Sequence, residues 1–526
     1  MKRLTARGIR ALLVGVPFTF LAVFFVWPVG AIVARGLWTD GAPHLRPLVD
    51  LARDPSLRHV IGFTFTQAAL STVMTLIVAL PATAVMSRYQ FRGRTLVGAL
   101  LTMPFVLPTV VVGTAFRSLG ISGSVPAIIT AHVFFNVAVV VRVVGASWRG
   151  LDRREEEAAR VLGCGPVRTF LRVTLPALRP AIVAASSIVF LFCFTSFGVI
   201  LILGGPQFAT IETEIYRQTA QLLDLETAAA LSIVQLVAVI AALALAGSMT
   251  GRVRAVVDRP RAQALPAGRW RALVGVALLP AIILVVVPLG ELLIRSFAHG
   301  ASGYTHLTTT PFGAASAPLD AVVTSIEVAI MATAIAVTLG LALATALTRP
   351  GRGRGARIAE LVVMLPLGVS AVTVGFGFLI VFDTPPLDLR TSWWIIPIAH
   401  ALVALPFVVR TTVPVLRSID PRQREAAATL GAGPVQVWRA VDRPVVAHAA
   451  RVAAGFAAAI SLGEFGATLF IVRPETTTVP VAIYRFLSRP GATNVDQAMA
   501  LATLLMALTG LAALAAERRS RFEVRP

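Results

Sequence analysis

The chain has 526 residues, of which 56% are hydrophobic and 14% charged, and its mean hydropathy is +0.80. This composition is too apolar for a soluble protein of that size, and apolar runs of about 20 residues, the length that spans a bilayer as a helix, recur throughout. The formal net charge of +21 does not indicate nucleic-acid binding, because the Arg residues lie in short loops between apolar runs and form no continuous face.

The hydropathy pattern predicts twelve transmembrane helices. They cover roughly residues 11–34, 60–86, 95–117, 124–147, 180–203, 226–249, 272–294, 320–347, 358–381, 392–415, 446–471 and 494–515. The first run resembles a signal peptide, but no A-x-A cleavage site follows it and its counterpart around Pro280 to Glu291 is internal. We therefore expect an all-α integral membrane protein.

Basic residues divide unequally between the two sides of these helices. The amino terminus and alternate loops after it, together with the carboxyl terminus, hold about three times as many Lys and Arg residues as the opposite loops. Since basic loops stay in the cytoplasm, the bias predicts a multi-pass protein of the bacterial cytoplasmic membrane with both termini in the cytoplasm.

A polar, Arg-rich segment at 152–176 separates the fourth and fifth predicted helices. Its pattern predicts a short helix, a tight turn and a second helix, with Asp152 at the first N-cap and Gly163 free to adopt a left-handed conformation after the first helix. Ala158 and Ala159 give the short helix a low-relief face suited to docking into a groove of another protein.

The same segment occurs a second time at 420–444, 268 residues later. The shared positions are Glu157/Glu425, Ala158/Ala426, Ala159/Ala427, Leu162/Leu430, Gly163/Gly431, Gly165/Gly433, Pro166/Pro434 and Pro176/Pro444. One such loop is compatible with an ordinary solvated connection. Two copies in register argue for a shared function.

The repeat extends well beyond this segment. His132 matches His400, Phe197-Gly198 matches Phe465-Gly466, and Tyr216 matches Tyr484, all at the same offset. The chain is therefore expected to consist of a first repeat at 1–255, a basic cytoplasmic linker at 256–271 and a second repeat at 272–526. Because each repeat has an even number of helices, the two are parallel, related by a pseudo-twofold axis along the membrane normal, with a pathway between them.

Several kinds of chemistry have no support. The only lysine is Lys2, so no phosphate-binding loop of the G-x-x-x-x-G-K-[ST] type exists, and neither H-E-x-x-H nor G-x-S-x-G occurs. Cys164 and Cys193 have neither a disulfide nor a metal-site pattern. We expect no catalytic residue, no metal site and no cofactor bound by this chain.

Polar groups within the predicted helices are candidates for the pathway. Glu464 is the best placed, and its counterpart in the first repeat is Ser196. The alternative is an acid near the outer end of a helix that reaches water or Arg473. His132 and His400 are either ligands facing each other across the axis or, as we favour, helix-packing residues bonded to carbonyls.

The pattern Glu-Ala-Ala, three residues, Gly and a later Pro resembles the EAA loop of the permease subunits of bacterial binding-protein-dependent ABC importers. The resemblance implies the type I importer permease fold and a coupling helix that docks on an ATPase. The implied coupling residues are Glu157, Ala158, Ala159, Gly163, Pro176, Glu425, Ala426, Ala427, Gly431 and Pro444. The second copy departs from the family's Leu-Pro ending, because Arg443 precedes its Pro444.

Within that family the chain is similar to the permeases of thiamine and ferric-iron importers, including their fused two-half arrangement. Three segments carry the similarity: AHVFFNVAVVVR at 131–142, FLFCFTSFGVILILGGPQFATIETEIYRQ at 190–218, and ISLGEFGATLF at 460–470. The resemblance implies a cytoplasmic ABC ATPase dimer, which uses ATP and Mg, and an extracytoplasmic solute-binding protein as partners, besides membrane lipid. A passive permease without an ATPase, and more remotely a membrane enzyme, are the alternatives.

The pathway residues indicate a cationic solute. Ser196, Phe197, Glu464 and Phe465 combine one acid with aromatic faces, which suits thiamine or a similar organic cation. Ferric iron prefers several carboxylate or phenolate oxygens, and none of the four tyrosines falls within a predicted helix centre. Thiamine is therefore slightly favoured over ferric iron.

Overall fold

The computed structural model describes residues 13–39, 42–43, 45–205, 207–250, 265–266, 268, 271–310, 316–348 and 354–521. This part of the chain is helical apart from loops and two pairs of two-residue strands. The strand β1 (Trp38–Thr39) pairs antiparallel with β2 (Ala42–Pro43), and β3 (Tyr89–Gln90) pairs in parallel with β4 (Leu265–Pro266). Most of the predicted linker at 256–271 lies outside the described residues.

The α-helices of the first half begin with Leu13–Leu37, whose last part is α2 (Trp27–Leu37). They continue with α3 (Arg46–Arg53), α4 (Pro55–Arg88), α5 (Arg94–Thr102), α6 (Thr109–Ser118), α7 (Val125–Arg149), α8 (Arg153–Val161), α9 (Pro166–Thr169), α10 (Leu175–Phe194), α11 (Gly198–Leu203), α12 (Ile211–Arg217) and α13 (Leu225–Thr250).

Those of the second half are α14 (Arg271–Arg295), α15 (Ser302–Thr305), α16 (Pro318–Leu347), α17 (Arg354–Met364), α18 (Ala371–Val381), α19 (Ile395–Arg417), α20 (Pro421–Thr429), α21 (Pro434–Val437), α22 (Arg443–Gly463), α23 (Thr468–Ile471), α24 (Val479–Leu487) and α25 (Ala492–Arg521). Short 3-10 helices lie at Met103–Val106, His306–Thr308, Leu365–Gly368 and Pro474–Thr476. π-Helical turns lie at Ala22–Val26, Phe170–Thr174, Gln218–Leu222 and Trp438–Asp442.

Ten helices among the described residues are long and apolar enough to cross a membrane, and they correspond to ten of the twelve predictions. Two of these predictions, 180–203 and 446–471, were wrong in their bounds, because the helices end at Phe194 and Gly463 and the chain is then interrupted. The other two of the twelve, predicted at 95–117 and 358–381, are broken. In the first, the helices on either side of the break bend by 107°. The cause is local: Leu107, which precedes a proline, and Pro108 are both extended, and a residue before proline is pushed out of the helical region. In the second, Val369 and Ser370 are extended at the corresponding place.

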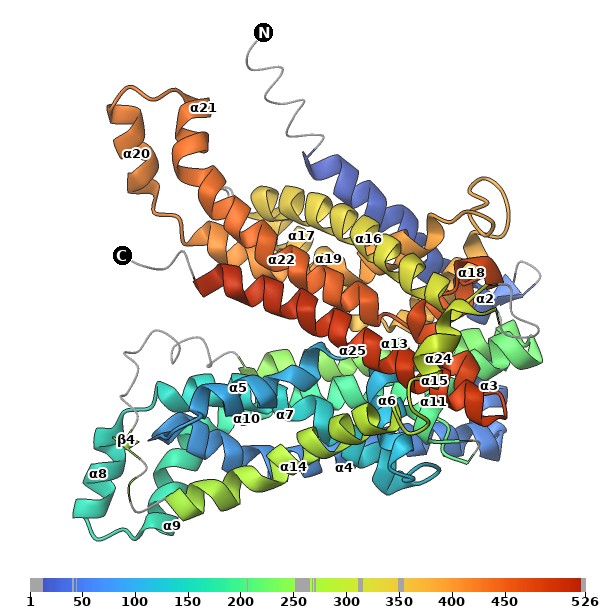
Figure 1. Ribbon diagram of the computed structural model, residues 1–526. Helices are drawn as coiled ribbons and strands as arrows, with labels where there is room; N and C mark the ends of the chain where they lie inside the picture. The colour runs from blue at the N-terminus through green and yellow to red at the C-terminus, as the bar shows by residue number, and fades with distance from the viewer. Residues whose placement is uncertain are drawn as a thin grey trace.

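The helices form two lobes that meet at one end and diverge at the other (Figure 1). In one lobe α4, α7 and α10 pack together, and in the other α16, α19 and α22 do the same. One hydrogen bond also recurs at equivalent positions of the two lobes. Ile211 N–H donates to Thr64 Oγ1 at 3.0 Å, and Val479 N–H donates to Ser325 Oγ at 2.8 Å. The internal repeat is thus visible in the fold, while the exact boundaries at 255 and 272 stay a prediction.

The first helix of each half packs on the opposite lobe. The helix Leu13–Leu37 lies against α18 and α19, where the Phe24 and Phe382 ring centroids are 5.5 Å apart. In return, α14 packs on α4 and α6. Figure 1 shows both exchanges, with the blue amino-terminal helix beside the orange lobe and α14 beside α4. The two halves are therefore joined by crossed helices as well as by their facing surfaces.

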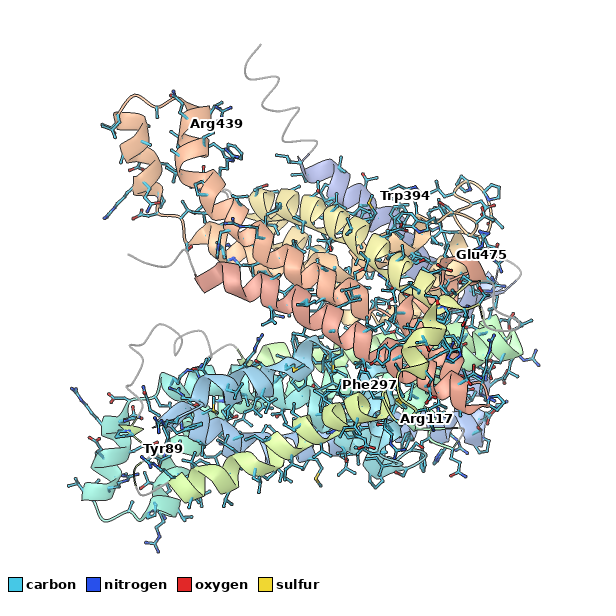
Figure 2. The ribbon with its side chains drawn as sticks, viewed as in Figure 1. Tyr89, Arg117, Phe297, Trp394, Arg439 and Glu475 are labelled. Atoms are coloured by element: carbon cyan, nitrogen blue, oxygen red, sulfur yellow. The ribbon has the colours of Figure 1, made fainter. Side chains whose placement is uncertain are left out.

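The diverging ends of the lobes carry the basic loops. Figure 2 places Tyr89 and Arg439 at these ends, and Arg117, Trp394 and Glu475 toward the end where the lobes meet. Tyr89 and Arg439 belong to loops that the Arg distribution predicts to be cytoplasmic, whereas Arg117 and Glu475 belong to opposite loops. The fold accordingly separates the two predicted classes of loop, one at each end of the molecule.

Candidate functional site

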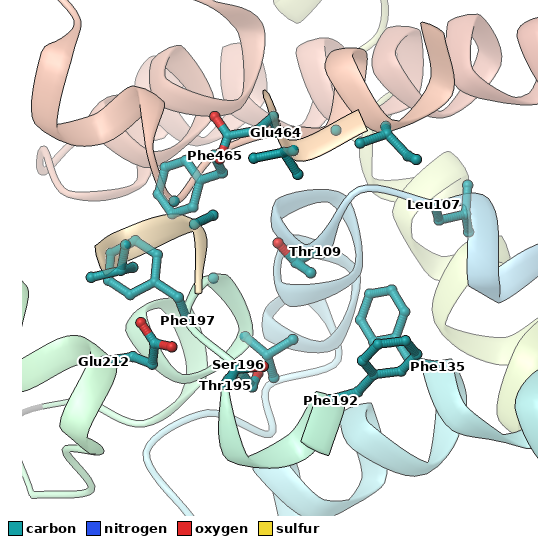
Figure 3. A pocket seen from close by; sticks show the side chains of 18 of the residues that line it. Leu107, Thr109, Phe135, Phe192, Thr195, Ser196, Phe197, Glu212, Glu464 and Phe465 are labelled. Carbon is teal, nitrogen blue, oxygen red and sulfur yellow. The ribbon is translucent and has the colours of Figure 1, made fainter. Parts of the chain in front are cut away.

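A cavity of about 380 Å³ lies between the two lobes (Figure 3). Residues at four interruptions of the helices line it, two from each repeat. They are Leu107 and Thr109, Thr195–Phe197, Ala371 and Val372 directly after the break at Val369–Ser370, and Glu464–Gly466. Lipid cannot satisfy the free peptide groups of a broken helix, so such breaks occur at membrane depth only inside the protein or beside a water-filled space. The convergence of four breaks on one cavity marks it as the central site.

Equivalent phenylalanines of the two repeats stack on each other at this site. The ring centroids of Phe197 and Phe465 are 5.5 Å apart, with 27° between their planes. Tyr216 meets Phe197 edge-on at 5.8 Å, and Tyr484 meets Phe465 edge-on at 5.7 Å. These four aromatic rings form two equivalent pairs, as the pseudo-twofold symmetry of the sequence requires. It joins the lobes at the wall of the cavity.

All four residues predicted for the pathway line the cavity: Ser196, Phe197, Glu464 and Phe465. The carboxylate of Glu464 is nonetheless occupied within the protein. It accepts hydrogen bonds from Ala467 N–H at 2.8 Å, Thr468 N–H at 3.0 Å and the Thr468 hydroxyl. His400 Nε2 lies 3.2 Å from Glu464 Oε2. Glu464 therefore caps the short helix α23 and borders the cavity at the same time.

A second acid, Glu212 on α12, also lines the cavity and was not singled out from the sequence. It accepts a hydrogen bond from Gln235 Nε2 and, across the lobe interface, one from Ser370 Oγ at 3.0 Å. The side chain of Glu212 is fully buried. No sequence pattern indicated this residue, because α12 lies outside the predicted transmembrane helices and the equivalent position in the second repeat is Pro480.

Each of the two equivalent histidines is bonded to a serine of a neighbouring helix. His132 Nδ1 lies 3.0 Å from Ser71 Oγ, and His400 Nδ1 lies 2.8 Å from Ser461 Oγ. Bonds to main-chain carbonyls were expected, whereas the partners found here are hydroxyl groups of neighbouring helices. Within the described residues no group of three or more His, Cys, Asp or Glu side chains could hold a metal ion.

The two predicted coupling loops fold as the sequence indicates. Asp152 accepts a hydrogen bond from Arg154 N–H, and Asp420 accepts one from Arg422 N–H, so both cap a nine-residue helix. Gly163 and Gly431 then adopt positive φ angles of 82° and 85°. In Figure 1 the loops stand at the tips of the diverging lobes, with α8 and α9 on one and α20 and α21 on the other.

The exposed faces of these loops are partly apolar. Glu157, Ala158, Glu425 and Ala426 are exposed, while Ala159 is buried and Ala427 is half-buried. The two prolines, Pro176 and Pro444, lie in the first turns of α10 and α22. Beside the left-handed glycines, Leu162 and Leu430 are 83% and 90% exposed. Large apolar side chains on a soluble loop usually mark a protein contact.

An internal bond holds each coupling helix to the π-helical turn that follows it. In the first loop the Thr174 hydroxyl donates to Glu156 Oε1 at 2.7 Å, and in the second Arg424 Nε donates to Asp442 Oδ1 at 2.8 Å. These pairs occupy equivalent positions with different chemistry. Glu156 also pairs with Arg88 at the end of α4, which ties the first coupling helix to the body of its lobe.

Comparison with known proteins gives a consistent result. Residues 63–259 match the family described as binding-protein-dependent transport system inner membrane component. The thiamine transport system permease protein of Salmonella typhimurium is 26% identical, with 87% of this chain and 88% of that protein covered. Its Escherichia coli counterpart is 24% identical, with coverages of 82% and 84%.

Two other matches are less specific about a solute. A probable ABC transporter permease of Sinorhizobium fredii is 25% identical, with 94% of both chains covered. A chain from the crystal structure of a bacterial ABC transporter involved in the import of alginate matches with a TM-score of 0.40 and 20% identity, covering 47% of this chain and 95% of that one. The broken helices, the paired loops and the full-length matches converge on one assignment. Residues 63–259 thus form a permease domain of the binding-protein-dependent transport family, and most of the chain resembles ABC importer permeases of the type in which both halves are fused in one polypeptide.

Proposed function

We propose that this permease imports a small organic cation, with thiamine favoured, which an extracytoplasmic binding protein delivers and a cytoplasmic ABC ATPase dimer drives inward. The observation that carries the proposal is the charge of the central cavity. Its described lining contains two acids, Glu212 and Glu464, and no lysine or arginine. Such a lining favours a cation over an anion, because a cation also stabilises the ionised form of Glu212.

The aromatic lining supports an organic cation. Phe105, Phe135, Phe192, Phe197 and Phe465 contribute faces to the cavity, and aromatic faces attract cations and stack on flat rings. The relatives named as thiamine permeases cover most of the chain and agree with this reading. Ferric iron is the weaker alternative, because it requires several free oxygen ligands while both acids are held by protein donors.

The geometry of the lobes supports a coupling mechanism. The lobes diverge toward the two coupling loops and meet at the opposite end (Figure 1). ATP binding closes the ATPase dimer and draws Glu157, Gly431 and their neighbours toward each other. Because each loop continues directly into a long helix of its own lobe, α10 or α22, this movement closes the inner side and opens the outer side.

The remaining assignments follow from the same proposal. Both termini lie in the cytoplasm, and one chain with its two repeats, 1–255 and 272–526, binds two ATPase subunits. The chain itself binds no cofactor, since ATP and Mg belong to the ATPase. Native mass spectrometry of the purified complex tests the stoichiometry, and two copies of this chain per two ATPases would overturn it.

Uptake measurements test the solute. The permease is expressed with its ATPase and binding protein in a strain without other thiamine uptake, and radiolabelled thiamine and ferric iron are followed separately. We expect thiamine uptake that needs both partners, and stimulation of ATP hydrolysis by the loaded binding protein. Uptake of iron without thiamine would establish the iron alternative, and uptake without ATPase would establish a passive permease.

A further inference from the structure

We propose that His132 and Asn136 form a polar subsite in the cavity wall that recognises an amino group on a flat ring of the solute. The inference rests on the proposed function and names the part of the solute that this wall recognises. Both residues lie on α7, four positions apart and hence on one face of that helix. Both line the cavity, and each is only 2% exposed.

Each of these side chains keeps one polar atom without a partner. Asn136 Nδ2 donates to the main-chain carbonyl of His132 at 2.8 Å and approaches Cys193 Sγ at 3.4 Å, while Asn136 Oδ1 has no hydrogen-bond partner. His132 Nδ1 is bonded to Ser71, while Nε2 has none. A buried polar atom without a partner costs about 1–3 kcal/mol, so both atoms favour a ligand that can bond to them.

The chemistry of the asparagine fixes what that ligand must offer. A carbonyl oxygen can only accept, so the nitrogen of the amide is the atom that faces the His132 carbonyl. Oδ1 is consequently the free atom, and it too can only accept. The subsite therefore requires a ligand with an N–H or O–H group that donates to Asn136 Oδ1. His132 Nε2 can donate to the same ligand or accept from it, according to the tautomer of the ring.

The second repeat lacks the subsite, which argues against a general packing role. The equivalent of His132 is His400, and both of its ring nitrogens are occupied, by Ser461 at 2.8 Å and by Thr468 at 2.7 Å. The equivalent of Asn136 is Ala404, which is fully buried. The wall of the second repeat therefore has no unpaired polar side-chain atom at His400 or Ala404, whereas the equivalent wall of the first repeat has one on His132 and one on Asn136. A solute that binds here is held asymmetrically.

Aromatic side chains surround the unsatisfied wall. Phe105, Phe135 and Phe192 line the same cavity, and the ring centroids of Phe105 and Phe192 are 6.3 Å apart. Figure 3 shows Phe135 and Phe192 on the side of the first repeat, opposite Glu464 and Phe465. A flat ring that contacts these faces and donates an amino hydrogen to Asn136 fits the chemistry of the wall. The aminopyrimidine ring of thiamine has both properties.

Direct binding to the nucleotide-free permease–ATPase complex in detergent, without the binding protein, tests the subsite. The probes are thiamine, the analogue whose pyrimidine amino group is replaced by oxygen, and 4-amino-2-methylpyrimidine. Loss of one hydrogen bond to a buried acceptor predicts that Asn136→Leu weakens thiamine binding about tenfold. The parent should bind the oxygen analogue more weakly than it binds thiamine. Asn136→Leu should bind the oxygen analogue with the same affinity as the parent does.

Two further variants separate recognition from folding. Asn136→Asp keeps an acceptor toward the cavity and should bind thiamine with an affinity within about threefold of the parent. If the amide of Asn136 had only a structural role, the Asp variant would bind thiamine as weakly as the Leu variant. Thr219→Val removes a hydroxyl that is also buried and unpartnered but does not line the cavity, and binding should not change. Thermal unfolding of each complex checks that the variant is folded.

The outcomes distinguish the subsite from the proposed function. Equal thiamine affinity for folded Asn136→Leu and the parent would mean that water alone fills the wall, and the subsite would be wrong. If the parent neither binds nor transports thiamine, the proposed solute is wrong. The subsite is then tested with 4-amino-2-methylpyrimidine alone. If this compound and its analogue with oxygen in place of the amino group bind equally well, the proposed subsite is wrong.

Discussion

Replacing Glu464 distinguishes a helix-capping acid from a free acid that waits for the solute. In Glu464→Ala, the main-chain N–H groups of Ala467 and Thr468 lose their acceptors, which lie at 2.8 and 3.0 Å. Each buried N–H without a partner costs about 1–3 kcal/mol, so the free energy of unfolding should fall by about 2–6 kcal/mol. Glu464→Gln keeps one acceptor and places an amino group against a donor, which should cost about 1–3 kcal/mol.

The equivalent position of the first repeat supplies the matched control. Ser196 borders the same cavity but no hydrogen bond of its side chain is found within the described part of the chain. Ser196→Ala should change the free energy of unfolding by less than about 0.5 kcal/mol. Unfolding by SDS titration in mixed micelles gives the three values. If Glu464→Ala is as stable as Ser196→Ala, the capping interpretation is refuted and Glu464 is a free acid of the pathway.

Three other predictions concern coupling and packing. Glu157→Lys and Gly431→Trp should leave the protein folded, since Glu157 is exposed and the space around Gly431 is open, although its φ of 85° adds about 1–2 kcal/mol of strain. Uptake and stimulated ATP hydrolysis should both fall, and normal uptake by the double variant would remove the loops from the mechanism. A double-mutant cycle on Arg424 and Asp442 should give a stability coupling below about 1 kcal/mol, because Arg424 is 44% exposed; a larger coupling would mean that the bond is a main support of the loop. Gly198→Ala places a Cβ atom 2.5 Å from Thr109 Oγ1 and should cost about 1–3 kcal/mol, measured by the same SDS titration. Adding Thr109→Ala should restore part of that loss, and no restoration would show that the strain lies elsewhere.

The sequence predicted the parts of the fold that depend on periodic or repeated patterns. Ten transmembrane helices and both helix–turn–helix loops follow directly from apolar runs, N-caps and left-handed glycines. The repeat identified Phe197 and Phe465 as equivalent residues, but it did not predict that they contact each other. The structure adds the stacking of their rings.

Other features depend on contacts that no local pattern encodes. The breaks near Pro108 and Ser370 were missed because hydropathy averages over a window and does not register two extended residues, although Pro104, Pro108 and Pro366 were visible signals. The protein partners of Glu464 and the cavity position of Glu212 depend on side chains far along the chain. Ser370 reaches Glu212 across 158 residues, a contact that only the folded lobes create.

The crossed first helices have a consequence for the order in which the protein is built. The helix Leu13–Leu37 leaves the ribosome first, yet one of its packing partners, α18, begins at Ala371. At about 5–20 residues per second, roughly 20–70 s of synthesis separate the two. During that interval the helix must reside in the bilayer with its eventual contact face covered by lipid or by the insertion machinery. This helix can pack on α13 soon after that helix is made, but its face toward α18 has no protein partner until late in translation, and the membrane acts as its temporary partner.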